Sequence, residues 1–110
     1  MTSSPPAAPL AGLVLTISFG TFTPQNTVHS ERELTVEIIA GDGYAGFSDT
    51  VEYQAIAVRD DVILLSWQEH IGSTIVHVLD LSSSRAYTAI TPATGDFTRL
   101  TGRIEVESLT

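Results

Sequence analysis

The chain has no cysteine, few cationic residues and no long apolar run, and each absence removes a class of function. Without cysteine, its 110 residues offer no disulfide, no thiolate nucleophile and no thiolate metal ligand. Only 5 Lys and Arg residues stand against 13 Asp and Glu residues, a net charge of −8. This balance argues against binding to nucleic acid or to an anionic membrane surface, since both require cations. No apolar run approaches the roughly 20 residues that span a membrane. We therefore expect a cytoplasmic protein.

The N-terminal stretch MTSSPPAAPLAG lacks the basic start and the apolar segment of a signal peptide. Its Ser, Pro and Ala content predicts a flexible tail over residues 1–11, followed by a single domain over residues 12–110. Hydrophobic residues make up 43% of the chain and charged residues 16%, which is typical of a globular domain rather than a disordered segment.

From Gly12 onward, apolar and polar residues alternate with a period of two, which is the pattern of β-strands. The pattern predicts strands over residues 13–22, 31–40, 51–58, 62–69, 73–80, 85–90 and 97–108, separated by short turn-forming segments. The fold class is therefore all-β. Uniformly short turns favour a small antiparallel up-and-down β-barrel of seven or eight strands, which can hold one small ligand. A β-sandwich is the competing architecture.

The segment ILLSWQEHIGSTIVHVLD (63–80) is typical of a hairpin around the turn His70-Ile71-Gly72. In a three-residue hairpin loop the last position adopts the left-handed conformation that suits Gly. This geometry makes Glu69 and Ser73 the closing pair. The cross-strand pairs that follow are Trp67 with Ile75, Leu65 with His77 and Ile63 with Leu79. All of them share one face, which carries the only Trp and which we assign to the barrel interior.

Glu69 and His77 are the candidate catalytic residues on this face. A carboxyl group among apolar side chains has a raised pKa, which suits it for proton donation near neutral pH. A nearby imidazole could hold or exchange that proton. The alternative is that Glu69, next to the turn, is a solvated charge at the barrel mouth. A turn longer by one residue would also shift the register and place His77 in solvent.

The segment SWQEHIGSTIVHVLD resembles the MoaF-like proteins, small calycin-type (lipocalin-like) barrels named after a protein associated with molybdenum-cofactor synthesis. The matching residues are Ser66, Trp67, Gln68, Glu69, Gly72, Thr74, His77, Val78 and Asp80. The segments LAGLVLTISF (10–19), AYTAI (86–90) and FTRLTGRI (97–104) also fit this family. The resemblance spans most of residues 10–107 and implies a calycin-type barrel.

The same hairpin is similar to the phenolic acid decarboxylases, which share this barrel type and carry a Trp-Thr-Glu-Pro-Thr-Gly-Thr segment. In that family the glutamate is a catalytic acid inside the barrel, and the resemblance implies this role for Glu69. Two tyrosines and an arginine of that family grip the phenol and the carboxylate. Their positions fall here at Ile17 and Phe19, and near Gly46 or Phe47. None of those groups is present, which argues against decarboxylation of a phenolic acid.

Three further polar residues are candidates for contact with a ligand inside the barrel. Tyr53 and Tyr87 lie in predicted strands at positions that can face inward, where a hydroxyl can donate to a ligand carbonyl. The alternative for each is a core tyrosine bonded to the backbone. Arg99, if it faces inward, could anchor an anionic ligand or pair with Glu69; if it faces outward, it is a surface charge.

The sequence contains no His-X-His or His-Glu-X-X-His spacing, no phosphate-binding glycine motif and no nucleophile elbow. We therefore expect no metal and no cofactor. The leading hypothesis is a cofactor-independent cyclase, isomerase or lyase acting on a small apolar, aromatic or polyketide-like molecule, with Glu69 as general acid/base. Trp67, Leu65, Ile75, Tyr53, Tyr87 and Arg99 would contact that molecule. The alternatives are a non-catalytic carrier barrel and a barrel filled by its own side chains. A homodimer is compatible with so small a barrel.

Overall fold

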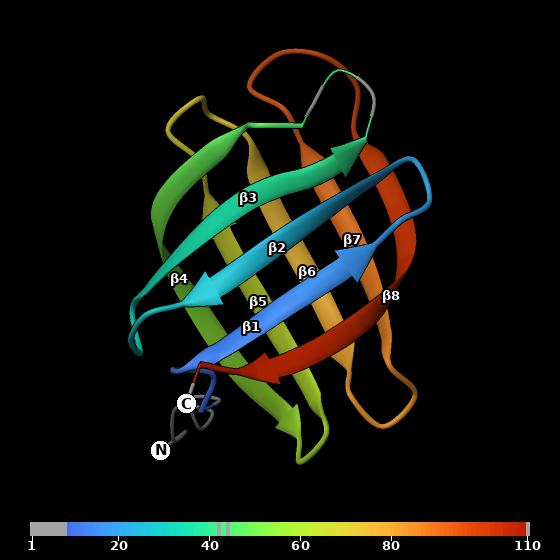
Figure 1. Ribbon diagram of the computed structural model, residues 1–110. Coiled ribbons are helices and arrows are strands. Elements are labelled where there is room, and N and C mark those ends of the chain that lie inside the picture. Colours follow the sequence, from blue (N-terminus) through green and yellow to red (C-terminus); the bar gives the residue numbers. More distant parts are fainter. Residues whose placement is uncertain (1–8, 42, 44, 110) are drawn as a thin grey trace, which may run out of the picture.

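The computed structural model of the chain describes residues 9–41, 43 and 45–109, which form an all-β fold of eight antiparallel strands (Figure 1). The strands are β1 (Leu13–Ser18), β2 (Phe22–Val28), β3 (Glu33–Gly41), β4 (Ser48–Arg59), β5 (Val62–Gln68), β6 (Thr74–Asp80), β7 (Arg85–Thr91) and β8 (Thr98–Ser108). Each strand pairs with the next along the chain, and β8 pairs with β1, so the sheet closes into an up-and-down barrel. The predicted fold class is confirmed. No helix in the described part of the chain is long and apolar enough to cross a membrane.

Closure depends on a long pairing between the first and last strands. β1 and β8 are in register from Leu13 opposite Ser108 to Ser18 opposite Arg103. The barrel therefore exposes no free strand edge along this seam, where an open sheet would offer unpaired backbone groups to other chains.

The second strand differs from the prediction. We expected one strand over residues 13–22, but the chain turns at Gly20, whose φ of +91° lies in the left-handed region. The sequence of β2, FTPQNTV, is polar and contains Pro24, which cannot donate to the ladder. The register against β3 shifts between Thr23 and Pro24, and this bulge accommodates the missing N–H.

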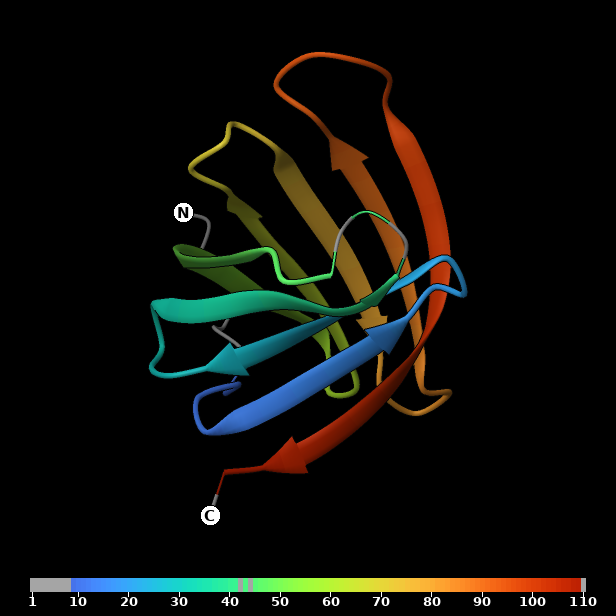
Figure 2. The same cartoon turned by 45° about the horizontal axis from the view of Figure 1, so that its top comes forward.

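The two ends of the barrel differ in their connections (Figures 1 and 2). The loops β1–β2, β3–β4, β5–β6 and β7–β8 lie at one end, which we call the upper end. The lower end holds the start of β1, the end of β8 and the three remaining turns. Because inward and outward side chains alternate along every strand of a closed barrel, the inward side chains of all eight strands fill the space between these ends.

The lower half of the barrel is filled by apolar side chains. Its buried residues include Leu10, Leu15, Val28, Leu34, Ile63, Leu79, Ala86 and Ile104. Residues 1–8 of the predicted tail lie outside the described residues. Leu10, which falls in the same predicted tail, is 2% exposed and belongs to this core. The chain just before β1 therefore closes the lower end.

Candidate functional site

The upper half of the barrel holds a cavity of about 740 Å³, bounded by the inward faces of the strands and by the upper loops. Its wall is mainly apolar and aromatic, with contributions from Phe19, Phe22, Val36, Phe47, Trp67 and Ile75. Glu69 and His77 are the two ionisable side chains among the described residues that line it. A volume of this size lies within the range of small-molecule sites, roughly 300–1,000 Å³.

The hairpin that carries both ionisable residues has the predicted register. Trp67 pairs with Ile75, Leu65 with His77 and Ile63 with Leu79. The Glu69 N–H donates to the Ser73 carbonyl over 2.8 Å, and the Gly72 N–H donates to the Glu69 carbonyl over 2.8 Å. Gly72 has a φ of +96°, so the turn places glycine at its left-handed position.

Glu69 lies on the cavity wall beside the β5–β6 turn, and only 9% of its surface is exposed. The Trp67 Nε1–H donates to Glu69 Oε2 over 3.2 Å. Burial raises the pKa of the Glu69 carboxyl, the hydrogen bond from Trp67 opposes this shift, and the negative charge of Asp49 adds to it. The carboxyl therefore keeps its proton to a higher pH than an exposed glutamate does.

His77 lies deeper, and its ring is enclosed by other side chains. Its exposure is 2%, and its Nδ1 lies 2.6 Å from Thr88 Oγ1. The Phe19 ring is nearly parallel to the imidazole at 6.4 Å between centroids, and the Trp67 ring is tilted against it at 5.3 Å. Burial lowers the pKa of His77 to about 4, so the ring is neutral at pH 7.

The two groups face the same cavity but not each other. Glu69 lies opposite Ser73 at the turn, whereas His77 lies opposite Leu65. Leu65 precedes Glu69 by four residues in the first arm of the hairpin. At about 3.3 Å per strand residue, this separates their backbones by roughly 13 Å. Trp67 lies between them and contacts both. The expectation that His77 holds or exchanges the proton of Glu69 directly does not fit this spacing.

The cavity mouth contains an acidic contact that the sequence did not reveal. Asp49, the second residue of β4, accepts a hydrogen bond from the His70 N–H over 2.8 Å. Its other carboxylate oxygen lies 2.7 Å from His70 Nδ1. These contacts hold the β5–β6 turn against β4 and bring a second carboxylate near Glu69. Without the register of β4 against β5, no pattern in the sequence links residue 49 to residue 70.

Tyr53 and Leu65 point inward, as predicted, but do not line the cavity. The Tyr53 hydroxyl donates to the backbone carbonyl of Ser30 over 2.6 Å, at the lower end. This is the backbone-bonded core tyrosine that we considered as the alternative. Leu65 is fully buried in the core beneath the cavity. Among the predicted ligand contacts, Trp67 and Ile75 do line it.

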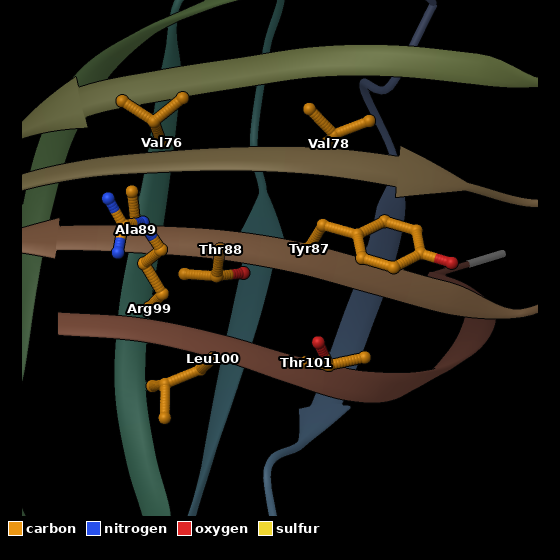
Figure 3. A pocket seen from close by; sticks show the side chains of 8 residues that line it. All are labelled: Val76, Val78, Tyr87, Thr88, Ala89, Arg99, Leu100 and Thr101. Carbon is orange, nitrogen blue, oxygen red and sulfur yellow. The ribbon is translucent and has the colours of Figure 1, made fainter.

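Tyr87 and Arg99 lie on the outside of the barrel, so the expectation that they face inward was wrong (Figure 3). On β7 the inward positions belong to Ala86 and Thr88, which leaves Tyr87 outside and 46% exposed. On β8 the inward side chains flank Arg99, whose guanidinium lies 4.7 Å from the centre of the exposed Phe97 ring. The outer surface between β6 and β8 forms a shallower hollow of about 370 Å³.

Asn26 is a buried polar residue that no pattern in the sequence predicted. It is fully buried on the inward face of β2, and within the described structure its Oδ1 and Nδ2 have no hydrogen-bond partner. It lies opposite Val36, which lines the cavity, and is two residues from Pro24, which also lines it. An amide therefore lies at the edge of the filled core, just below the cavity.

A metal site is not evident from the residues in the described ranges, where no three His, Asp or Glu side chains gather. The sequence profile of the MoaF-like family matches residues 11–105. Among solved structures, a "putative beta-lactamase" from Burkholderia vietnamiensis superimposes with a TM-score of 0.85 at 30% identity. The match covers 96% of this chain and 100% of that one. No curated protein matches the sequence.

Proposed function

This chain belongs to the MoaF-like family, and from that premise we propose that its barrel binds a small, largely apolar molecule. We further propose that Glu69 transfers a proton to or from that molecule as a general acid/base, without a cofactor. The reaction class is a cyclisation, isomerisation or elimination. The observation that carries the proposal is a largely buried carboxyl on the wall of an apolar cavity of about 740 Å³.

The environment of Glu69 suits a proton-transfer group. Among the described residues its carboxyl accepts one side-chain hydrogen bond, from Trp67, and it lines the cavity. Burial shifts the pKa of the carboxyl toward neutral pH, and general acid/base catalysis is most effective when the pKa lies near the working pH. The aromatic wall supplies orientation, because a molecule held between Phe19 and Trp67 has little freedom to rotate.

The name of the structural relative does not transfer to this chain. Class A β-lactamases use a Ser-X-X-Lys motif, and this sequence contains no lysine. The chemistry proposed for Glu69 needs neither a lysine nor a serine nucleophile.

A test can measure proton transfer without knowledge of the natural substrate. The ketone 2-tetralone has acidic protons next to its carbonyl, which exchange with D₂O when a base removes them. Binding is measured by quenching of Trp67 fluorescence, and exchange by proton NMR. We expect the wild-type protein to accelerate exchange, and Glu69→Gln to lower the protein-catalysed rate by roughly 100-fold or more.

The matched control is Glu37→Gln, because Glu37 is an exposed glutamate on the outer face of β3. The Glu37→Gln variant should catalyse exchange of the 2-tetralone protons at the wild-type rate. Equal exchange in wild type and Glu69→Gln would refute the acid/base role. If the wild type bound 2-tetralone without accelerating exchange, the acid/base role would be refuted and the result would support a non-catalytic carrier barrel. Failure of 2-tetralone, 1-naphthol and 2-ethylnaphthalene alike to change the fluorescence of Trp67 would refute the ligand cavity.

A further inference from the structure

The inner end of the cavity is chemically distinct from its mouth, and His77 is the polar group there. The imidazole lines the cavity with one nitrogen, Nδ1, turned toward Thr88 on β7. The other nitrogen, Nε2, has no protein partner among the residues that the structure describes. A ring buried to 2% exposure thus offers one free polar atom to whatever occupies the cavity.

The contact with Thr88 determines which nitrogen carries the hydrogen. If Nδ1–H donated to Thr88 Oγ1, the Thr88 hydroxyl hydrogen would need an acceptor of its own. The described structure provides none, and Thr88 is only 5% exposed, so that hydrogen would be buried without a partner. If the hydroxyl instead donates to Nδ1, its hydrogen is satisfied. The neutral ring then carries its own hydrogen on Nε2.

We propose that Thr88 holds His77 as the Nε2–H tautomer, and that this N–H donates a hydrogen bond to an oxygen at the buried end of the ligand. The ligand class is thus a neutral aromatic or polycyclic molecule with a carbonyl or comparable acceptor oxygen at that end. The inference rests on the proposed function, since it places a ligand in the same cavity, and it assigns His77 as the residue that positions it.

The charges of the cavity favour a neutral ligand over a carboxylate. The described lining contains no arginine, the chain contains no lysine, and Arg99 lies on the outer surface. A carboxylate at the inner end would therefore be buried without a countercharge, which is strongly unfavourable. At the mouth, the ionisable side chain of the lining is the carboxyl of Glu69, which offers an entering anion no countercharge.

The rings around His77 favour a flat molecule. Phe19 lies within 12° of parallel to the imidazole, and Trp67 covers it from another side at 54°. A planar ligand stacked on Phe19 lies roughly parallel to the imidazole and can reach Nε2 with an in-plane oxygen, while the inclined Trp67 ring contacts its edge. The separation of Glu69 and His77 along the hairpin then places the reacting part of the molecule near the mouth and the recognised oxygen at the inner end.

Two measurements test this assignment, and neither depends on proton transfer by Glu69. The first is the tautomer of His77 in the ligand-free protein, read from the ¹⁵N shifts of the two ring nitrogens by NMR. We expect the hydrogen on Nε2 in the wild type and in Thr88→Ser, which keeps the hydroxyl. Thr88→Val, which removes it, should lose this preference. A hydrogen on Nδ1 in the wild type would overturn the assignment.

The second measurement compares ligands of the same shape by titration of Trp67 fluorescence. We expect the wild type to bind 2-acetylnaphthalene roughly tenfold more tightly than 2-isopropylnaphthalene, which lacks the oxygen, because one hydrogen bond distinguishes them. It should also bind 2-naphthoate more weakly than the ketone.

His77→Phe should abolish the preference for the ketone, whereas His77→Gln, which still offers an N–H, should retain part of it. An unchanged preference in His77→Phe, or tighter binding of the carboxylate in the wild type, would contradict the assignment. Because the exchange of 2-tetralone is measured separately, failure here and failure of the role of Glu69 can be told apart.

Discussion

Protonation of His77 should make the stability of this protein strongly dependent on pH. The ring is 2% exposed and its pKa falls from 6.5 to about 4 on folding, because burial disfavours the charged form. Between these values the unfolded chain binds a proton that the folded protein does not. The free energy of unfolding should therefore be at its full value above pH 6.5 and fall as the pH is lowered toward 4. The loss corresponds to about 3 kcal/mol over this interval.

The assay is urea unfolding at a series of pH values between 4 and 7.5, followed by the fluorescence of Trp67, the single tryptophan of the chain. Glu69 acts in the opposite direction, because its raised pKa lets the folded protein hold an extra proton above pH 4.5. The contribution of His77 is therefore taken as the difference between wild type and His77→Gln. His29→Gln, which alters an exposed histidine, is the matched control.

Between pH 6.5 and pH 4 the wild type should lose about 3 kcal/mol more stability than His77→Gln. His29→Gln should retain most of the wild-type dependence. Parallel pH curves for wild type and His77→Gln would refute the reasoning, because they would mean that His77 is protonated equally in the folded and unfolded states.

Three other substitutions test separate parts of the barrel, each by its urea midpoint. Gly72→Ala should lower stability by about 1–2 kcal/mol, because φ is +96° and a Cβ would lie 2.7 Å from that of Ala93; an unchanged midpoint would mean that the turn relaxes. Leu10→Ala should cost about 2–5 kcal/mol if Leu10 closes the core, and almost nothing if it does not. Asn26→Val should stabilise the protein by about 1–3 kcal/mol, since it removes two unpaired buried polar atoms, whereas Asn26→Asp should destabilise it; a destabilised valine variant would indicate that the amide is satisfied.

The hairpin at residues 63–80 could be predicted in detail because its information is local. The spacing of Gly72 after Glu69 fixes the turn, the turn fixes the register, and the register places Trp67 and His77 inside. Period-two alternation then gives most of the remaining strands. Whether the barrel holds a cavity or is filled by its own side chains could not be decided from the sequence, since this depends on how side chains from all eight strands fill the interior.

The errors on β7 and β8 have a common cause. Both strands place small residues inward, Ala86 and Thr88 on β7 and Gly102 on β8, so that the bulkier Tyr87 lies outside. At Gly102 a Cβ would lie 2.8 Å from the Phe19 ring, so the absent side chain makes room for the aromatic residue that follows β1. The alternation on these strands could not tell which face points inward, because packing fixes the total side-chain volume inside the barrel and not the volume contributed by each strand.

The strand β2 was missed because its signals are those of a loop. Pro24 and a run of polar residues interrupt the alternation, and the bulge that rescues the pairing depends on β3. With β2 went Asn26. The contact of Asp49 with His70 was missed for a related reason, because it depends on the exact register of β4 against β5.

The barrel has a hollow upper half and a filled lower half, so substitutions in the two halves affect different properties. Those in the upper half alter the cavity, and those in the lower half alter stability. Residues such as Leu15, Leu34 and Leu79 belong to the hydrophobic core and do not line the cavity. Phe22 and Phe47 shape the cavity, and they lie at its loops rather than in the lower core. A descendant of this protein could thus acquire a new ligand by exchanging side chains at the upper end, while the lower end continues to supply the stability that such exchanges consume.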